Sequence, residues 1–424
     1  MTKTIKLALV AAMAMGATSA FATNGDNLIG TGAKSRAMGG TGIAHFSGSE
    51  SDTANPALIT RVKGTNFTFG GTYFRPDVEI TKSGAAVGDG THTSDAKHNV
   101  IPYVALTENL GNGWAVGASM FGSAGMGTDW RSVQDQNDAG GSVGDMGLFS
   151  MRSNLLLLKF SVPVAYGQDN WSVGIAPVMM YGALDIAFDN NFVAGGPDIG
   201  NGSSASFGAG LEFGAAYRLP DIGITLGATY HSSIEMEYKD QISTAAAAFG
   251  YGLPGANFVG FSDKLEQPAE YGLGIDWTEG DVSVTADWKN IRWGNARGYQ
   301  DFGWENQNVY ALGAEYRMDD FALRIGYNYA KNPIKNNTDT TDVLGPNTNG
   351  DTMNTFNHVM FPAITERHYT VGAGYKFTKN IGADFAFTYA TSPDVTVSAA
   401  TVGLGDITVT NDQIAVSANL NYSF

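Results

Sequence analysis

Cysteine is absent from this 424-residue sequence. The chain therefore forms no disulfide bonds, and it has no cysteine-containing ligand set for a structural zinc ion. Six histidines are present, but none has the HExxH spacing or another metal-ligand spacing, so we expect no metal site. The stability of the protein has to come from the fold itself.

Long apolar runs are also scarce. One run, residues 7–15, follows two lysines and leads to Ala20-Phe21-Ala22, which is the pattern of a secretory signal peptide spanning residues 1–22. After residue 22 there is no stretch of about 18 uncharged apolar residues, which excludes a transmembrane helix. No helical hydrophobic period persists, whereas 55 glycines and 11% aromatic residues favour a large all-β protein.

Positive charge is low as well. The chain has 25 Lys and Arg against 41 Asp and Glu, and cleavage before Thr23 leaves 23 basic residues. Because nucleic-acid affinity comes mainly from Lys and Arg on phosphates, we exclude nucleic acid as a partner. There is no GxSxG elbow and no GxxxxGK[ST] phosphate loop, so we expect neither an enzyme nor a cofactor. An esterase with its triad on strands is the enzyme class that spacing does not test.

Alternation is what the sequence has in abundance. From Thr65 onward, apolar residues alternate with small or polar ones over segments of about 10 to 14 residues, the length that a tilted strand needs to cross a bilayer. Between Tyr369 and Phe377, the larger residues share one face and Thr, Gly, Gly and Lys share the other. Fourteen such segments lie at about residues 65–75, 99–108, 113–124, 153–166, 170–186, 205–218, 222–239, 267–278, 281–293, 307–317, 320–331, 366–377, 381–391 and 411–424.

Short and long connections alternate along the chain between these segments. Every second one is a tight turn, such as Met318-Asp319, and the others have roughly 12 to 34 residues. An up-and-down barrel has this pattern, whereas a Greek-key sandwich has no reason to keep it. Aromatic residues near strand ends, and Phe424 as the last residue, fit the interfacial girdles of outer-membrane barrels. We therefore predict a 14-stranded antiparallel transmembrane β-barrel over residues 64–424.

Residues 23–63 form the one long segment without strand alternation. Glycines recur every few residues, and Pro56 keeps Asn55 out of the helical region. Because an empty barrel of fourteen strands would leak solutes, we predict that this segment is an N-terminal hatch, a plug inside the lumen. We expect most inward-facing charges to pair with each other or with the hatch, the alternative being contact with a ligand. These charges are Lys159, Glu212, His231, Glu270, Asp276, Asp287, Lys289, Glu315, Arg317, Arg324, Lys376 and Asp384.

Several short motifs, in a fixed order along the chain, make the sequence similar to one known protein family. The Gly-rich stretch from Ala37 to Ala44 is followed by Asn55-Pro56-Ala57, and then by the fourteen strands. Further motifs are Thr229-Tyr230-His231-Ser232 before a long loop, Leu265 to Glu270 leading into the next strand, and Arg367. Over essentially its whole length the chain resembles the long-chain fatty acid transporter (FadL) family of outer-membrane proteins, which includes channels for aromatic hydrocarbons.

The resemblance implies a monomeric barrel in the bacterial outer membrane that takes up hydrophobic small molecules passively, with long-chain fatty acids as the first candidate. It also implies capture in a groove between the third and fourth outer loops, and passage to an interior pocket near the mature N-terminus. Release would then be sideways into the membrane lipid, through an inward kink in the third strand. The kink would fall at Gly122-Ser123-Ala124-Gly125, where glycines let a strand bend. The alternative is a strand that simply ends at its loop.

Apolar residues in the outer loops fit such a groove independently. Clustered aromatics in a loop indicate either a binding surface or a small core that folds the loop on itself. The candidates are Phe188, Phe192, Phe249, Tyr251, Leu253, Phe258 and Phe261. Lys159, Arg324 and Lys376 are candidates for holding a fatty carboxylate, although a nearby acid explains each of them equally well.

Two other classes of protein share parts of this pattern. A general diffusion porin would have the same barrel, and an adhesin or receptor barrel would have the long loops. Neither class explains a hatch of about forty residues before the first strand. The hatch therefore favours the transporter.

Overall fold

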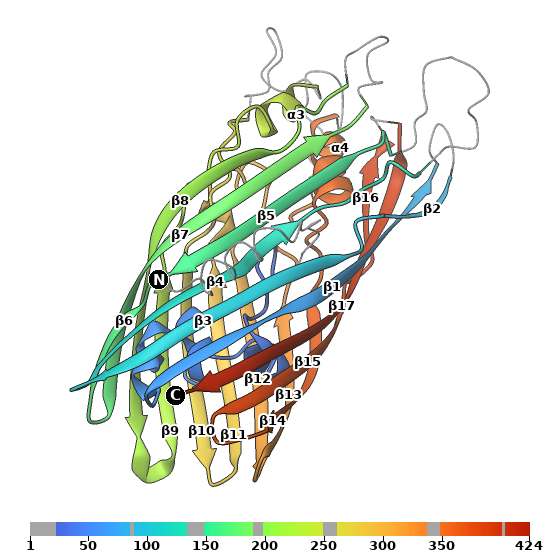
Figure 1. The fold of residues 1–424 in the computed structure, drawn as a ribbon. Helices are drawn as coiled ribbons and strands as arrows, with labels where there is room; N and C mark the ends of the chain where they lie inside the picture. The colour runs from blue at the N-terminus through green and yellow to red at the C-terminus, as the bar shows by residue number, and fades with distance from the viewer. Residues whose placement is uncertain are drawn as a thin grey trace.

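The computed structural model describes residues 23–84, 89–133, 148–189, 198–248, 261–336, 348–400 and 403–424. One closed antiparallel sheet winds into a tall barrel with strongly tilted strands (Figure 1). The predicted signal peptide, residues 1–22, lies outside the described residues. In the described part of the chain, no helix has both the length and the apolar character needed to cross a membrane.

Fourteen strands make the wall, which confirms the predicted number. Strands β5 and β6 together form one of them, because both pair with β4 on one side and with β7 on the other. β2 and β16 only extend the ladders of β1 and β17, and β1 pairs with β17 to close the barrel. The bounds are β1 (Thr65–Ser83), β2 (Gly90–Thr93), β3 (Asn99–Gly111), β4 (Trp114–Met126), β5 (Arg152–Ser161), β6 (Val164–Gln168), β7 (Trp171–Ala187), β8 (Ser204–Leu219), β9 (Ile224–His231), β10 (Glu270–Glu279), β11 (Val282–Ile291), β12 (Gln307–Met318), β13 (Phe321–Ala330), β14 (Arg367–Lys376), β15 (Ile381–Thr391), β16 (Val395–Ala399) and β17 (Gly405–Ser423).

Strand lengths differ from the prediction at two places. β1 and β17 are longer than expected and pair over 18 positions, up to Ser83 opposite Asp406. β-Branched residues in both strands favour this extended ladder. β9 is shorter than expected and ends at His231, because the residues that follow leave the sheet. Ile234 and Met236 are buried there against wall glycines.

The two faces of the wall have opposite characters. Large apolar side chains on the outer face are exposed, with Leu312 at 55%, Leu323 at 51% and Ile325 at 60%. Near a row of turns, the ring of Tyr166 packs at a tilt against Trp114 and in a T-shaped contact with Trp171, as girdle residues do. The outer face therefore suits a hydrocarbon environment.

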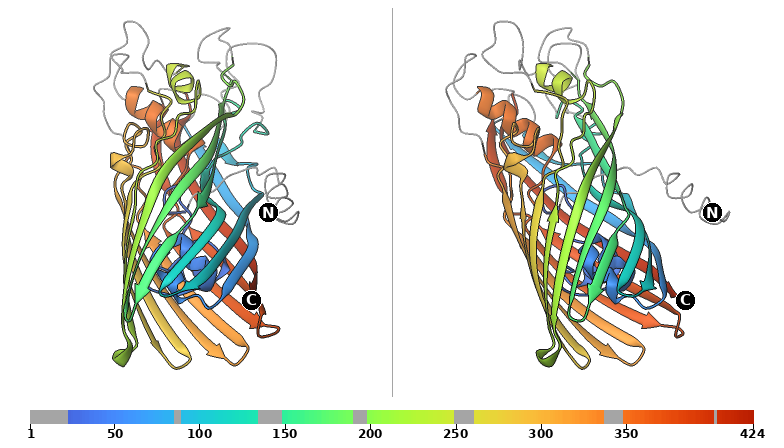
Figure 2. Two further views of the ribbon diagram at one scale, coloured as in Figure 1. Left: turned by 60° about the vertical axis from the view of Figure 1, so that its left-hand side comes forward. Right: turned by 90° about the vertical axis from the view of Figure 1, so that its left-hand side faces the viewer.

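The hatch lies inside the lower half of the lumen, where Figure 2 shows it in blue behind the strands. Its short helices are α2 (Ala33–Ala37), η1 (Gly48–Thr53) and η2 (Pro56–Arg61). Glycines of the wall leave room for its backbone. A Cβ atom on Gly174 would lie 2.6 Å from the carbonyl carbon of Pro56, and one on Gly313 would lie 2.7 Å from the carbonyl oxygen of Met38. Close approach of a second backbone is a common reason for glycine in a strand.

The outer end of the barrel is closed by the connection between β13 and β14. It contains α4 (Thr348–Thr355) and the π-helix η5 (Phe356–Met360), and every residue from 350 to 365 is buried. The carbonyl oxygen of Val359 accepts hydrogen bonds from Thr128 Oγ1 and Trp130 Nε1, both at 2.8 Å. The sequence predicts a long outer loop here, whereas the chain folds into the mouth of the barrel. We call residues 350–365 the outer plug. Other connections carry η3 (Pro220–Ile222), α3 (Ile242–Ala248) and η4 (Trp293–Asn295).

Candidate functional site

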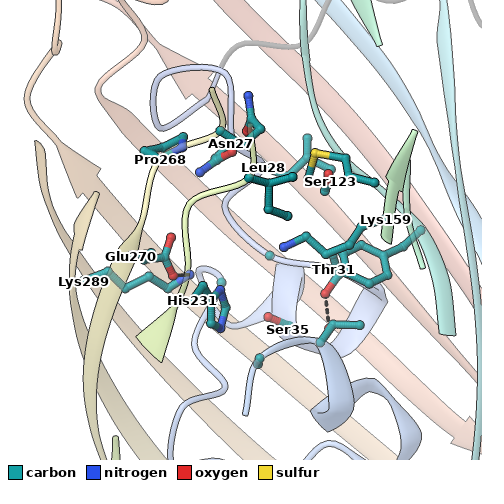
Figure 3. A pocket seen from close by; sticks show the side chains of 18 of the residues that line it. Asn27, Leu28, Thr31, Ser35, Ser123, Lys159, His231, Pro268, Glu270 and Lys289 are labelled. Carbon is teal, nitrogen blue, oxygen red and sulfur yellow. Dashed lines mark hydrogen bonds and ion pairs between the residues drawn. The ribbon is translucent and has the colours of Figure 1, made fainter. Parts of the chain in front are cut away.

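An interior pocket of about 100 Å³ lies between the first part of the hatch and the wall (Figure 3). Side chains from β4, β5, β7, β9, β10 and β11 line it together with hatch residues. Its apolar lining includes Leu28, Phe121, Met180 and Ile234. The pocket therefore combines apolar surface with the ionisable groups described next.

Four ionisable side chains line this pocket, and a fifth, Glu212, lies against two of them. Lys159 Nζ donates a hydrogen bond to Glu212 Oε1 at 2.8 Å, and His231 Nδ1 lies 3.8 Å from the same oxygen. Lys289 Nζ lies 3.6 Å from Glu270 Oε1. Each of the five side chains is at most 19% exposed. Because a buried charge is costly without a partner, the lysine and the glutamate within each pair stabilise each other.

Two sequence motifs converge on this pocket. Thr229 to Ser232 ends β9 and supplies His231, while Leu265 to Glu270 leads into β10 and supplies Gln267 and Glu270. The pairing of β9 with β10 places Glu270 directly opposite His231. A long loop separates the motifs in sequence, so spacing alone does not reveal that they face one pocket.

A short hairpin, residues 23–28, separates the interior pocket from the outer plug. Asp26 in this hairpin is fully buried and accepts hydrogen bonds from Tyr299 Oη and, at 3.4 Å, from Gln267 Nε2. Burial raises the pKa of Asp26 to about 7, although the two hydrogen bonds act to lower it. Gly25 has φ +68° and lies against the ring of Trp293, where a side chain would not fit.

A second cavity, of about 20 Å³, lies on the far side of Tyr299 beneath the outer plug. We call it the outer cavity. Phe302, Trp304 and Phe356 are among its lining residues, and none of the described lining residues is charged. Because Gln267 lines the interior pocket and Tyr299 lines the outer cavity, Asp26 and its two partners form the partition between them.

β4, the third wall strand, is irregular at the position of the expected kink. Its register with β5 shifts between Gly122 and Ala124. Its pairing with β3 stops at Phe121 opposite Tyr103, although β3 continues along β1 as far as Asn99. Beyond Phe121, the described pairings therefore leave the facing edges of β3 and β4 without ladder bonds to each other.

The hatch occupies this break in the ladder. Leu28 N donates to the carbonyl oxygen of Ser123 at 3.2 Å, and Gly125 N donates to that of Asp26 at 3.1 Å. Asn27 forms an antiparallel bridge with Ala124 between them. Leu28 packs in a small apolar cluster with Ile101 and Phe74, and it also lines the interior pocket with Ser123. Within the described residues, this part of the hatch therefore lies between the pocket and the break between β3 and β4, with Ile101 beside it.

The Asn-Pro-Ala triplet anchors the hatch instead of lining the pocket. Asn55 Nδ2 donates to the carbonyl oxygens of Ile43 at 2.7 Å and Ala215 at 3.1 Å. Asn55 Oδ1 accepts from Ala57 N at 3.0 Å and so caps η2. One amide thus joins two parts of the hatch to β8.

Charged wall residues also hold the hatch, as expected for the inward-facing charges. Asp287 accepts hydrogen bonds from Gly42 N at 2.8 Å and Ile43 N at 3.0 Å. His45 Nδ1 lies 2.7 Å from Asp276, and Lys34 Nζ lies 3.6 Å from Asp384. These contacts come from β10, β11 and β15, so the hatch is attached around much of the wall.

The three candidate carboxylate partners lie in different places. Lys159 lines the interior pocket. Arg324 lies across the hatch, where it bonds to Glu315 and Asp384, both at 2.7 Å. Lys376 is exposed at the end of β14 and lines the same separate cavity of about 340 Å³ as Arg324. Within the described chain, no group of three His, Asp or Glu is placed to hold a metal ion.

The described loop aromatics belong to a core. Phe188 is 2% exposed within the large apolar cluster at the outer end. Phe261 stacks on Phe302 with ring centroids 4.9 Å apart, and Phe302 stacks on Phe356 at 4.7 Å. The remaining candidates lie outside the described residues: Phe192, Phe249, Tyr251, Leu253 and Phe258. The stack joins three loops, and local sequence patterns carry no signal for such contacts.

Two solved structures share this architecture. The toluene transporter TodX of P. putida superposes with a TM-score of 0.66 at 20% identity, covering 94% of this chain and 99% of that one. A FadL homologue of Pseudomonas aeruginosa superposes with a TM-score of 0.66 at 17% identity, covering 94% and 100%. At these identities, the superpositions show a common fold.

Sequence comparison extends the similarity to curated proteins. The long-chain fatty acid transport protein of Escherichia coli O6:H1 is 24% identical over 379 residues, 78% of this chain and 82% of that one. A protein of Chlorobium limicola is 43% identical over 101 residues, and the match spans 23% of this chain and half of that protein. The family described as outer membrane protein transport protein (OMPP1/FadL/TodX) matches residues 7–424. The chain therefore belongs to this family of outer-membrane transport proteins.

Proposed function

We propose that this outer-membrane barrel takes up hydrophobic molecules passively and releases them sideways into the membrane. The molecule passes beneath the outer plug, enters the interior pocket and leaves between β3 and β4. The observation that carries this proposal is the break in the ladder beyond Phe121, which the hatch fills with Asn27 and Leu28. Displacing residues 23–28 would remove the hatch segment from this break while leaving the described ladder bonds between wall strands in place.

Transfer energetics support a lateral route. An acyl chain gains about 0.8 kcal/mol per methylene on leaving water. The barrier to a hydrophobic molecule is then the polar surface of the outer membrane, and not the hydrocarbon beneath it. A path that ends in the bilayer has to bypass only that surface, so the concentration gradient is a sufficient driving force.

Long-chain fatty acids and aromatic hydrocarbons are the two candidate ligands. The relatives include a protein named for each, a long-chain fatty acid transport protein and a toluene transporter. Lys159 and Lys289 are the cations that a fatty carboxylate would meet in the interior pocket, while the uncharged lining of the outer cavity supports a hydrocarbon. Both fit the proposed route.

The lumen is filled at two levels, by the hatch and by the outer plug. This supports the transporter over a general diffusion porin, which needs an open aqueous path. It also gives the hatch a role that an adhesin or receptor barrel leaves unexplained. In liposome swelling with small sugars, we expect no uptake, and rapid swelling would favour the porin.

A disulfide across the break tests the lateral route. Asn27 and Ala124 are directly opposed, and the sequence has no cysteine that would interfere. We expect cells carrying the pair Asn27→Cys and Ala124→Cys to lose uptake of labelled oleate and toluene under oxidation and to recover it on reduction. The matched control is the pair Met179→Cys and Ala209→Cys, opposed on the lipid face between β7 and β8. Full uptake by the oxidised Asn27–Ala124 pair would refute lateral release.

A further inference from the structure

Both lysines of the interior pocket already have an acidic partner. Lys159 bonds to Glu212 at 2.8 Å, and Lys289 lies 3.6 Å from Glu270. The remaining ionisable group, His231, also lies beside Glu212. The two pairs cancel in charge, so the pocket offers no unpaired ammonium group among the residues that line it.

A ligand carboxylate would enter this arrangement as a third acid. It would lie beside two fixed carboxylates that are 2% and 12% exposed, and it would compete with them for the same two lysines. Like charges in one buried site disfavour each other strongly because little water screens them. An uncharged molecule brings no such conflict and still buries its apolar surface on Leu28, Phe121 and Met180.

The outer cavity and the partition, which lie before the interior pocket on the proposed route, also disfavour a carboxylate. The described lining of the outer cavity carries no charge. The partition beyond it carries Asp26, which is an acid, with the neutral partners Tyr299 and Gln267. Among the described residues that line the outer cavity and the partition, a carboxylate therefore meets no cation before the paired lysines.

One neutral polar contact remains open in the pocket. The Nε2 atom of His231 is buried and has no hydrogen-bond partner among the described residues. It can bond to a hydroxyl group of a ligand, either as acceptor or as donor according to its tautomer. This favours uncharged molecules that carry a hydroxyl, and it leaves plain hydrocarbons acceptable.

On the basis of the proposed function, we propose that the interior pocket selects uncharged hydrophobic molecules over carboxylates, and that Glu212 and Glu270 impose this selection by neutralising Lys159 and Lys289. The ligand class is then hydrocarbons and neutral alcohols or phenols. Fatty acids are disfavoured in their ionised form.

Matched ligand pairs test this proposal. Binding of decanol and decanoate, and of toluene and benzoate, is measured by equilibrium dialysis at pH 8 on the full chain in nanodiscs of uncharged lipid, with empty nanodiscs as the blank. We expect each neutral molecule to bind at least about tenfold more tightly than its acid. Equal or tighter binding of the acids overturns the proposal. If none of the four molecules binds, the proposed function fails instead.

Charge variants identify the residues responsible. Glu270→Gln leaves Lys289 unpaired, so we expect decanoate to bind at least about tenfold more tightly while decanol changes little. Glu279→Gln, at the exposed far end of the same strand, is the control and changes neither. Adding Lys289→Gln to Glu270→Gln abolishes the gain. Retained decanol binding shows that the pocket of a variant is intact. If Glu270→Gln loses decanol binding, the same test is made with Glu212→Gln, which leaves Lys159 without its acidic partner. No gain for decanoate in an intact variant overturns the assignment.

Discussion

The hatch and the outer plug close the same lumen by different chemistry. The hatch is held by polar contacts, such as the amides of Gly42 and Ile43 on Asp287, and its backbone lies on wall glycines. The outer plug also has polar contacts, such as those of Thr128 and Trp130 with Val359, and it adds an aromatic stack in which Phe356 lies on Phe302. Hydrogen bonds are directional and depend on geometry, whereas apolar contacts can be replaced by any apolar molecule. A hydrophobic ligand can therefore substitute for the aromatic contacts of the outer plug, but not for the hydrogen bonds that hold the hatch.

The largest effect is expected from a side chain placed beneath the hatch. Gly313→Val puts a Cβ atom 2.7 Å from the carbonyl oxygen of Met38, so the hatch has to move from the wall. We expect a leak of ions, measured as conductance in planar bilayers, where the unchanged protein conducts little. Ala314→Val, the next residue on the opposite face of β12, is the matched control. Unchanged conductance of Gly313→Val would show that the hatch tolerates the displacement.

A large effect is expected at the outer plug. Phe356→Ala removes a 4%-exposed ring from the aromatic stack, a type of change that costs about 3 to 5 kcal/mol in protein cores. We expect hydrogen exchange of residues 350–365 to accelerate and the uptake of toluene to rise several-fold, with no ion leak because the hatch stays seated. The control, Phe321→Ala, removes a ring that is 54% exposed on the outer face. Slower uptake in Phe356→Ala would show that the plug assists transport.

The smallest effect is expected from the ionisation of Asp26. Burial raises the pKa of Asp26 to about 7, so the seating of residues 23–28 is most favourable below the unseated pKa near 3.8, weakens as pH rises from there to 7, and changes little above 7. We expect the protection factor of the Gly125 amide, which donates to the backbone oxygen of Asp26, to fall between about pH 4 and pH 7 in hydrogen exchange. Asp26→Asn should remove this fall. A protection factor independent of pH in the unchanged protein would contradict the assignment.

Much of the wall was predictable from the sequence because strand alternation and turn lengths are local. The register shift in β4 falls within residues 122–125, where glycines let a strand bend, but a lateral opening there stays a prediction. The outer plug was not predictable, because residues 350–365 lie in a long connection without strand alternation, and their apolar residues have no local partner in the sequence. Their burial depends on contacts with Thr128 and Trp130, which are distant in sequence.

The interior pocket was predictable only in part. The inward orientation of Lys159 follows from its position in an alternating strand. Its pairing with Glu212 depends on which side chains lean toward each other across three strands, and sequence spacing does not fix that. For the same reason, the sequence gives Arg324, Lys376 and Lys159 equally as candidates for binding a ligand carboxylate. The structure separates them, because Arg324 and Lys376 line a cavity on the other side of the hatch.

The seam between β1 and β17 has a mechanical consequence for the barrel. These first and last strands are joined by 18 residue pairs, whereas β3 and β4, two strands further along, share only eight. The joints β8–β9 and β9–β10 also share eight pairs each, so stress applied to the ring during passage of a bulky guest would fall on these shorter joints and not on the seam. The reinforced seam thus keeps the cylinder from unzipping at its chain ends while a shorter joint yields.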